Sequence, residues 1–239
     1  MTKVEAIEQV MMSNGGTASL SLIYDEIEKY YPSAKVSKEW AAGIRGVLYR
    51  ELKTGRRFKK IGISIYALND YMEENLPTER VRMHSYIEGI CIELGNLKRY
   101  DTYTADPSAI YRDKLRLNNF TSLENIPPFS YPQILSEAKK IDVIWFNNKG
   151  LSFPQKAFEV VDSIGTLNGA LNRCAQLQYI NTDFYIVAPS KHYGKFNKTL
   201  EMEIYEGIRK RFSFISYDDI LSFYEGIVKT NKIETKIFG

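Results

Sequence analysis

The stretch that decides the fold reads Ile141-Asp142-Val143-Ile144-Trp145-Phe146, followed after a turn by Ala157-Phe158-Glu159-Val160-Val161. Both segments are apolar on two faces, which is typical of central strands in a sheet that is covered on both sides. A single acidic residue interrupts each segment. Burying a carboxylate in a sheet costs several kcal/mol unless something offsets the cost, so Asp142 and Glu159 require an explanation.

Two carboxylates on neighbouring strands can hold a divalent cation such as Mg²⁺ or Mn²⁺. An ion bound there would activate water and neutralise charge on a phosphodiester that is being cleaved. In the alternative interpretation, each acid lies at a strand end and is solvated or paired with Lys139, Lys140 or Lys156. The two interpretations differ in whether the carboxylates meet.

The residues around this stretch predict an α/β (α+β) domain over 83–239, with a central mixed sheet flanked by helices. Further strands are expected at 100–105, 183–188 and 212–216, and helices at 84–98, 167–180, 197–211 and 218–228. Residues 106–133 are polar and carry four prolines. We expect a long functional loop there rather than core.

The first seventy residues predict a separate small domain. Apolar residues at helical spacing indicate helices over about 4–11, 19–30 and 38–52, with Ser37 as N-cap of the third. A short hairpin over 58–68 follows. This is the element order of a winged helix-turn-helix domain, whose third helix enters the major groove of DNA. Residues 71–82 are expected to form a linker to the second domain.

Positive charge is concentrated in the part of this small domain that would meet DNA. The net charge of the chain is +3, but residues 38–60 hold eight basic residues against two acidic ones, a local excess of +6. Such an excess is expected of a phosphate-binding face, although a solvated charged helix or a protein-docking surface is the alternative. The predicted DNA contacts are Arg45, Arg50, Lys53, Arg56, Arg57, Lys59 and Lys60, with Arg173, Lys191 and Lys195 from the second domain.

The remaining composition argues against several other classes of protein. No apolar run approaches the roughly 20 residues that span a bilayer, and the first residues do not resemble a signal peptide, so we expect a cytoplasmic protein with no membrane partner. Cys91 and Cys174 lack metal-ligand spacing, which argues against a disulfide framework or a structural zinc site. His84 and His192 are each expected to be a surface or capping residue.

Four stretches of the small domain resemble a known winged-helix family. They are residues 19–27 (SLSLIYDEI), 44–51 (IRGVLYRE), 57–62 (RFKKIG) and 66–68 (YAL). The family, HARE-HTH-like, is often fused to restriction nucleases and chromatin proteins and is found in a bacterial RNA polymerase subunit. The resemblance implies that this domain binds double-stranded DNA.

Five stretches of the second domain resemble restriction-endonuclease-like proteins of the PD-(D/E)XK superfamily. They are residues 84–89 (HSYIEG), 93–96 (ELGN), 103–106 (YTAD), 141–146 (IDVIWF) and 154–160 (PQKAFEV). The resemblance implies a type II restriction endonuclease that hydrolyses double-stranded DNA with Mg²⁺ (or Mn²⁺). It implies that Glu88 joins Asp142 and Glu159 as metal ligand and catalytic residue, with Glu93 as the fallback for Glu88. Double-strand cutting of a palindrome would favour a homodimer.

The sequence departs from this superfamily at position 161. Side chains of a strand repeat with period two, so Val161 shares a face with Glu159 where relatives carry a lysine or glutamate. Asp162 is expected to face the other way unless a bulge re-aims it. Gln176 or Gln178 on the following helix could supply the missing catalytic group. Two alternatives stay open: a catalytically impaired nuclease fold that only binds DNA, and a modification-dependent nuclease whose winged helix senses methylated bases.

Overall fold

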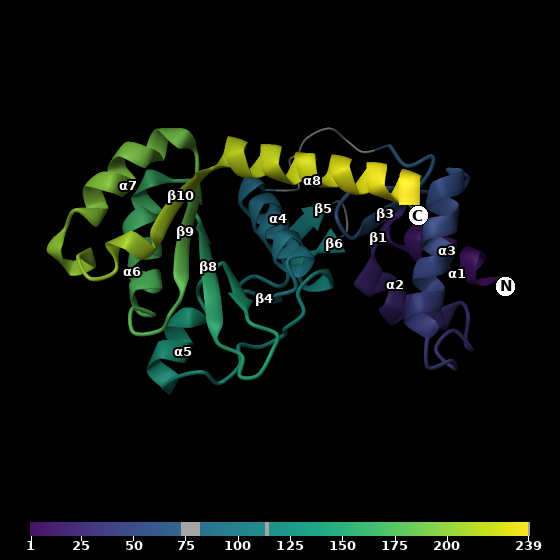
Figure 1. Ribbon diagram of the computed structural model, residues 1–239, viewed down its shortest axis with the longest axis horizontal. Coiled ribbons are helices and arrows are strands. Elements are labelled where there is room, and N and C mark those ends of the chain that lie inside the picture. The colour runs from purple at the N-terminus through teal and green to yellow at the C-terminus, as the bar shows by residue number, and fades with distance from the viewer. Residues whose placement is uncertain (73–81, 113–114, 239) are drawn as a thin grey trace. The chain divides into compact units, whose positions relative to one another are not determined.

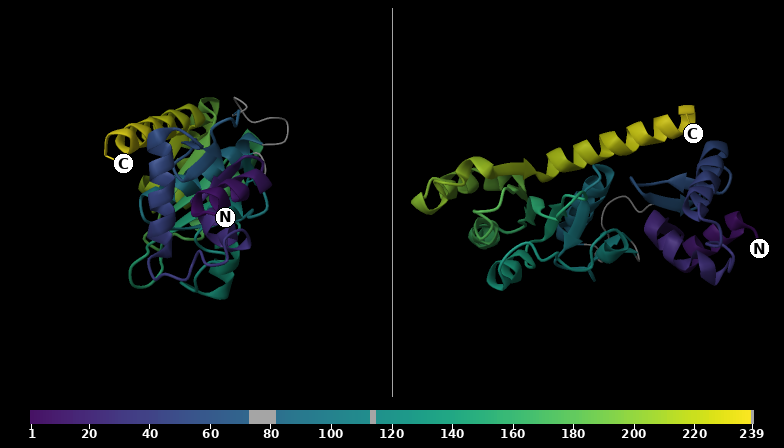
Figure 2. Two further views of the ribbon diagram at one scale, coloured as in Figure 1. Left: turned by 90° about the vertical axis from the view of Figure 1, so that its right-hand side faces the viewer. Right: turned by 60° about the horizontal axis from the view of Figure 1, so that its bottom comes forward.

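The computed structural model describes residues 1–72, 82–112 and 115–238, so the predicted linker at 71–82 lies almost entirely outside the described residues. The chain divides into two compact units (Figures 1 and 2). One comprises Met1–Thr78, Arg112–Leu115 and Glu225–Gly239, and the other comprises Glu79–Tyr111 and Arg116–Tyr224.

The N-terminal unit contains the three predicted helices and the predicted hairpin. Its elements are α1 (Lys3–Ser13), β1 (Thr17–Ser19), α2 (Leu20–Glu26), the 3₁₀ turn η1 (Ile27–Lys29), α3 (Trp40–Thr54), β2 (Phe58–Lys60) and β3 (Ile65–Leu68). The strands pair antiparallel in the order β1-β3-β2. One expectation is wrong: α3 begins at Trp40 after Glu39, and the Ser37 hydroxyl instead accepts a hydrogen bond from the Glu39 amide in the preceding turn.

Local chemistry explains where these helices begin and end. At α1, the Thr2 side chain accepts from the Glu5 amide and the Glu5 carboxylate accepts from the Thr2 amide, which is a capping box. At α2, the Ser19 hydroxyl accepts from the amide of Leu22. Helix α3 ends at Thr54 and is capped by Gly55, whose φ of 62° lies in the left-handed region that glycine adopts without strain.

The second unit is built on a five-stranded mixed sheet, which confirms the predicted architecture. The strands, in spatial order, are β10 (Phe212–Ser216), β9 (Asp183–Ala188), β8 (Pro154–Val160), β7 (Val143–Phe146) and β4 (Asp101–Thr104). Strands β8, β9 and β10 run parallel, whereas β7 is antiparallel to both β8 and β4. Its helices are α4 (Met83–Leu97), α5 (Pro132–Ala138), α6 (Leu167–Ala175) and α7 (Tyr193–Leu200), and α8 (Tyr217–Phe238) belongs to this unit as far as Tyr224.

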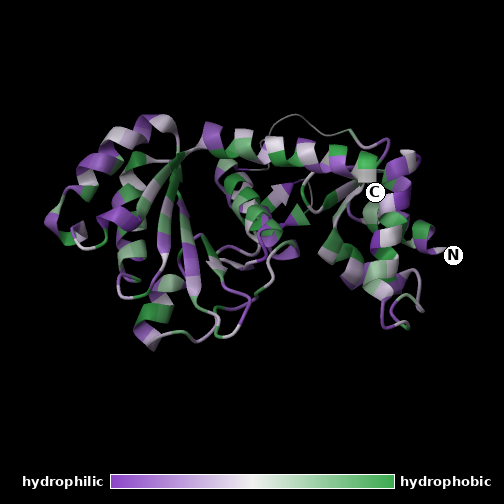
Figure 3. Cartoon of the chain, in the orientation of Figure 1, coloured by the Kyte–Doolittle hydropathy of each residue, from purple (hydrophilic) through white to green (hydrophobic). Residues whose placement is uncertain are grey.

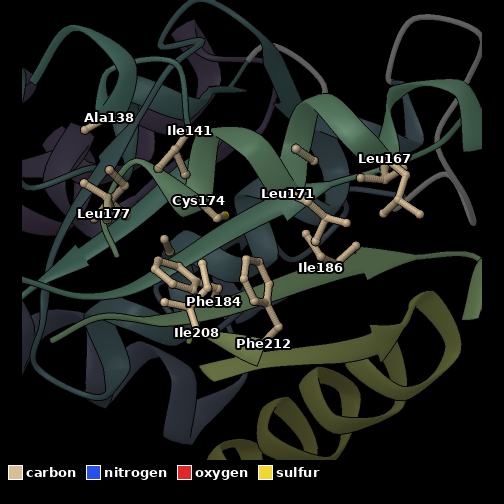
Figure 4. Packing of buried hydrophobic residues seen from close by; sticks show 14 of the residues in the cluster. Ala138, Ile141, Leu167, Leu171, Cys174, Leu177, Phe184, Ile186, Ile208 and Phe212 are labelled. Atoms are coloured by element: carbon tan, nitrogen blue, oxygen red, sulfur yellow. The ribbon is translucent and has the colours of Figure 1, made fainter. Parts of the chain in front are cut away.

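The two faces of this sheet are covered by different helices. On one face, α6 contributes Leu171 and Cys174 to a buried apolar cluster with Phe184 and Ile186 of β9 (Figure 4). On the other face, α4 packs so closely that a Cβ on Gly95 would lie 2.6 Å from Thr102. Helix α4 is largely apolar (Figure 3), and ten of its residues are buried. A helix buried around most of its circumference belongs to the core, so a charged residue on it is unusual.

The helix expected over 197–211 is wrong in its extent, because α7 begins at Tyr193 and already ends at Leu200. The Nε of Arg209 donates to the Leu200 carbonyl at 2.6 Å, so an arginine from further along the chain satisfies the end of the helix. Two 3₁₀ turns, η5 (Glu203–Tyr205) and η6 (Arg209–Arg211), follow. The contact between Arg209 and Leu200 is a tertiary contact, so the helical periodicity of the sequence could not predict where α7 ends.

Helix α6 is likewise shorter than the predicted 167–180, since it ends at Ala175. The guanidinium of Arg211 donates to the carbonyls of Gln178 at 2.7 Å and Thr182 at 2.8 Å, which holds the following turn. The expected loop at 106–133 contains short structured pieces: β5 (Ile110–Arg112), β6 (Leu115–Arg116) and the 3₁₀ turn η2 (Leu117–Asn119). Among the described residues, no helix is both long and apolar enough to cross a membrane.

Candidate functional site

Asp142 and Glu159 lie on neighbouring segments of the sheet, as the sequence predicts. Asp142 directly precedes β7, and the antiparallel register pairs Val143 with Phe158, so Asp142 falls beside Glu159 of β8. The Asp142 carboxylate is fixed there because its Oδ2 accepts a hydrogen bond from the Val160 amide at 2.7 Å. The two acids therefore meet at the same end of the β7–β8 pair.

Glu88, the third predicted ligand, reaches this place from the first half of α4. Its side chain is only 2% exposed. Oε1 lies 3.6 Å from Nε2 of His84, and Oε2 is buried with no hydrogen-bond partner among the described residues. Burial raises the pKa of Glu88 to about 7; His84 opposes the rise, and the negative charges of Asp142 and Asp106 add to it. A buried carboxylate with an unpartnered oxygen is costly, so this position is one where a cation would be stabilising.

His84 lies among these acids, which the sequence interpretation missed. Its Nε2 is 3.6 Å from Glu88 and 3.6 Å from Oδ2 of Asp142, and its Nδ1 is 3.7 Å from Oδ2 of Asp162. Burial by itself lowers the pKa of His84, but hydrogen bonding to Asp142 and Glu88 outweighs it and raises the pKa to about 10. The signal was present in the sequence, because residues four apart on a helix share a face.

Potential ligand atoms of His84, Glu88 and Asp142 all lie within 4.8 Å of one another. We call these three residues the α4–β7 cluster. One side of it is bounded by Asp162, which accepts a hydrogen bond from the Tyr217 hydroxyl. Asp162 was expected on the sheet face opposite Glu159, and its Oδ2 lies 3.7 Å from Nδ1 of His84 on α4, whereas Glu159 pairs with Arg173 of α6.

Glu159 has a different partner. Its carboxylate is fully buried and accepts two hydrogen bonds from Arg173 of α6, one from Nε at 2.6 Å and one from Nη2 at 2.5 Å. Burial raises the pKa of Glu159 and the Arg173 guanidinium opposes that rise, while the pairing raises the pKa of Arg173. Arg173, predicted to contact DNA, therefore pairs with the buried glutamate, with its side chain 31% exposed.

The other candidates for the position next to Glu159 do not reach it. Val161 is buried in the apolar cluster beneath α6, so no polar group enters there. Gln176 is exposed at the end of α6, where its side-chain amide lies 3.5 Å from the Asn172 carbonyl. Arg173, about one turn earlier on α6, is the residue that approaches Glu159.

Glu93, the fallback for Glu88, occupies a separate environment on α4. It is 1% exposed and accepts hydrogen bonds from the hydroxyls of Tyr111 at 2.7 Å and Tyr224 at 2.9 Å. The Tyr111 ring lies directly against the helix, since a Cβ on Gly89 would come within 2.2 Å of it. Glu93 therefore contributes to packing on this side of the helix, and it is Glu88 that meets Asp142.

Several of the predicted DNA contacts of the N-terminal unit interact with other residues of that unit. Arg45 donates to the Tyr24 hydroxyl at 2.9 Å, Arg57 pairs with Glu8 at 2.6 Å, and Lys59 donates to the Tyr71 carbonyl. The half-buried Lys60 also lies on the hairpin. Arg50, Lys53 and Arg56 are exposed, as are Lys191 and Lys195 of the second unit.

Comparison with known families shows to which family the residues around this site belong. Residues 66–237, well over half of the chain and the whole α4–β7 cluster, match the family described as the type II restriction enzyme NmeDI C-terminal domain. No curated protein and no solved structure matches the chain significantly. The match confirms the resemblance to restriction endonucleases at the level of the family. The chain belongs to the family of the type II restriction enzyme NmeDI C-terminal domain.

Proposed function

We propose that the second unit is a PD-(D/E)XK-type endonuclease that hydrolyses phosphodiester bonds in double-stranded DNA with Mg²⁺ or Mn²⁺, as a type II restriction endonuclease does. The observation that carries the proposal is the buried, unpartnered Oε2 of Glu88 beside Asp142 in a chain of a restriction-enzyme family. A structural carboxylate in a core is expected to have both oxygens satisfied, so this one is suited to a ligand.

The residues present fit a divalent cation. Carboxylate oxygens are the ligands that Mg²⁺ and Mn²⁺ prefer, and Glu88 and Asp142 supply them from two different elements. These two residues would hold the ion. When bound, such an ion acts as a Lewis acid on the phosphodiester and lowers the pKa of a water molecule.

The protein's own groups prepare the site in three ways. The Val160 amide fixes the Asp142 carboxylate, so its position does not depend on a ligand. Arg173 donates two hydrogen bonds to Glu159, which fix that carboxyl group, and its guanidinium places a positive charge on the α6 side of the site. Val161 leaves that side otherwise apolar, which limits the entry of water. Positive charge near a cleaved phosphodiester stabilises the charge that develops in the transition state.

We further propose that residues 1–70 form a winged-helix domain that binds duplex DNA and that residues 83–239 form the nuclease domain. The support is the order of helices and hairpin in the N-terminal unit and the exposure of Arg50 and Lys53 on α3. Exposed basic residues on the third helix of such a domain are placed for phosphate contact. A homodimer would suit a two-fold symmetric recognition site.

The test is cleavage of supercoiled plasmid, methylated and unmethylated, by wild type and by Asp142→Asn in the presence of Mg²⁺, Mn²⁺ or EDTA. We expect metal-dependent cutting by wild type and none by Asp142→Asn, with DNA binding retained in a gel-shift assay. Cutting of methylated plasmid alone would favour a modification-dependent nuclease. DNA binding without cutting under every condition would favour the catalytically impaired alternative, and undiminished cutting by Asp142→Asn would refute the site.

A further inference from the structure

We propose that the divalent ion is bound by His84, Glu88 and Asp142 through one nitrogen and two oxygens, that Glu159 is not a ligand, and that the site binds Mn²⁺ more tightly than Mg²⁺. This inference rests on the proposed function, because it assigns the ligands of the same metal site.

His84 is oriented toward the two carboxylates that would hold the ion. Its Nε2 lies at equal distances of 3.6 Å from Glu88 and Asp142, the two carboxylates that would hold the ion. Its other nitrogen faces Asp162, which is itself held by the Tyr217 hydroxyl. A carboxylate behind a histidine is the usual outer arrangement of a metal-binding imidazole, because it fixes the ring and the tautomer.

The spacing of two of the proposed ligands along α4 suits a single ion. His84 and Glu88 are four residues apart on α4, so both side chains leave the same face of the helix. Two ligands at this spacing can bind one ion without any distortion of the backbone, as in helical motifs that bind zinc through residues four apart. The buried Oε2 of Glu88, which has no partner among the described residues, is the second and independent sign of a ligand.

Glu159 is already occupied by a cationic side chain. Both of its carboxylate oxygens accept charge-assisted hydrogen bonds from Arg173, and the side chain is fully buried. A cation there would compete with the arginine for these oxygens, and the guanidinium would repel the ion. Glu159 is therefore assigned to Arg173, and Arg173 becomes a positioning residue on the α6 side of the site.

The choice of metal follows from the nitrogen ligand. Mg²⁺ is a hard ion that prefers oxygen ligands and keeps several waters, whereas imidazole suits the transition metals. Mn²⁺ accepts carboxylate oxygens and lies within the first-row series, so a mixed site of one nitrogen and two oxygens favours it over Mg²⁺. Replacing His84 with glutamine should narrow this preference as well as lower the affinity for Mn²⁺ by about tenfold or more.

The test uses the full chain and Mn²⁺ as the probe, with electron spin-echo envelope modulation to detect ¹⁴N bound to the ion. We expect nitrogen modulation in wild type and in His192→Gln, which removes the other histidine, and none in His84→Gln. Calorimetric titration of the same samples should show Mn²⁺ binding to Glu159→Gln as tightly as to wild type. Circular dichroism checks that each variant is folded.

Bound Mn²⁺ without nitrogen modulation, or a Glu159→Gln variant that loses Mn²⁺ as Asp142→Asn does, would overturn the assignment. In either case, metal-dependent plasmid cleavage by the wild-type sample would leave the proposed function intact. Absence of any Mn²⁺ binding together with absence of cleavage would reject both the ligand assignment and the proposed function.

Discussion

Two buried glutamates lie five residues apart on α4, and their surroundings differ in kind. Glu93 is 1% exposed and receives the hydroxyls of Tyr111 and Tyr224. Glu88 is 2% exposed, yet one of its oxygens lacks a hydrogen-bond partner among the described residues, and His84 and Asp142 lie beside it. The carboxylate of Glu93 therefore accepts hydrogen bonds from hydroxyls of the protein itself. The carboxylate of Glu88 keeps one oxygen that can bind a ligand.

The difference shows why burial alone does not identify a functional acid. Both side chains have left water, and both incur the desolvation cost of a carboxylate. At Glu93, neutral hydroxyl donors offset that cost within the fold. At Glu88, the surrounding groups are mainly further titratable side chains, including Asp142 and Asp106, and burial raises the pKa of Glu88 to about 7. An acid that the fold leaves unsatisfied is the better candidate for function.

The largest expected effect is on the free energy of unfolding, which should respond differently to replacement of Glu93 and of Glu88. Glu93→Leu removes the acceptor of two buried tyrosine hydroxyls and should lower the free energy of unfolding by about 1–3 kcal/mol for each of them. Glu88→Leu removes a buried carboxylate with an unpartnered oxygen, so stability in EDTA should stay unchanged or rise. Urea denaturation of both variants measures this, and equal destabilisation would end the distinction.

The pH dependence of stability sharpens the comparison at Glu88. Its pKa is raised from 4.5 to about 7 in the folded protein, so the folded state binds this proton more tightly than the unfolded state. Metal-free wild type should therefore lose stability relative to Glu88→Gln as pH rises from about 4.5 to 7, by at most about 3 kcal/mol. Denaturation in EDTA across this range tests the sign. A difference that stays constant with pH would mean that Glu88 is not buried as described.

The sequence predicted most strands of the sheet and the adjacency of the two acids, but it did not predict which side chains pair with those acids. The apolar runs at 183–188 and 212–216 form β9 and β10 at those residues, because a strand buried on both faces has a clear pattern. The adjacency of Asp142 and Glu159 followed from the same reasoning. Arg173 could not be assigned to Glu159, because an arginine on a helix has the same pattern whether it faces solvent or a buried acid.

His84 was missed for a different reason. A lone histidine in a sequence is most often an ordinary surface residue, and its role here depends on Asp142 and Asp162 from the β7 and β8 ends. The choice between Glu88 and Glu93 likewise depends on Tyr111 and Tyr224, which only the fold brings to α4. The residue pattern of one helix predicts which side chains share a face, but it does not predict which residues of other elements contact them.

The smallest expected effect concerns DNA affinity, which in this account resides away from both glutamates. Replacing Arg50, exposed on α3, with glutamine should lower the slope of log affinity against log salt concentration by about one unit for the lost phosphate contact. Glu88→Gln and Glu93→Gln serve as controls and should keep the wild-type slope. Fluorescence anisotropy with a labelled duplex measures it. An unchanged slope for Arg50→Gln would remove this residue from the DNA contacts.

The central claim is that the Glu88 end of α4 is a metal site and the Glu93 end is not. Isothermal titration of Mn²⁺ into wild type, Glu88→Gln and Glu93→Gln at one pH tests it most directly. We predict the same dissociation constant for wild type and Glu93→Gln, and a value weaker by about tenfold or more for Glu88→Gln. Wild-type affinity in Glu88→Gln, or a loss of binding confined to Glu93→Gln, would contradict the claim.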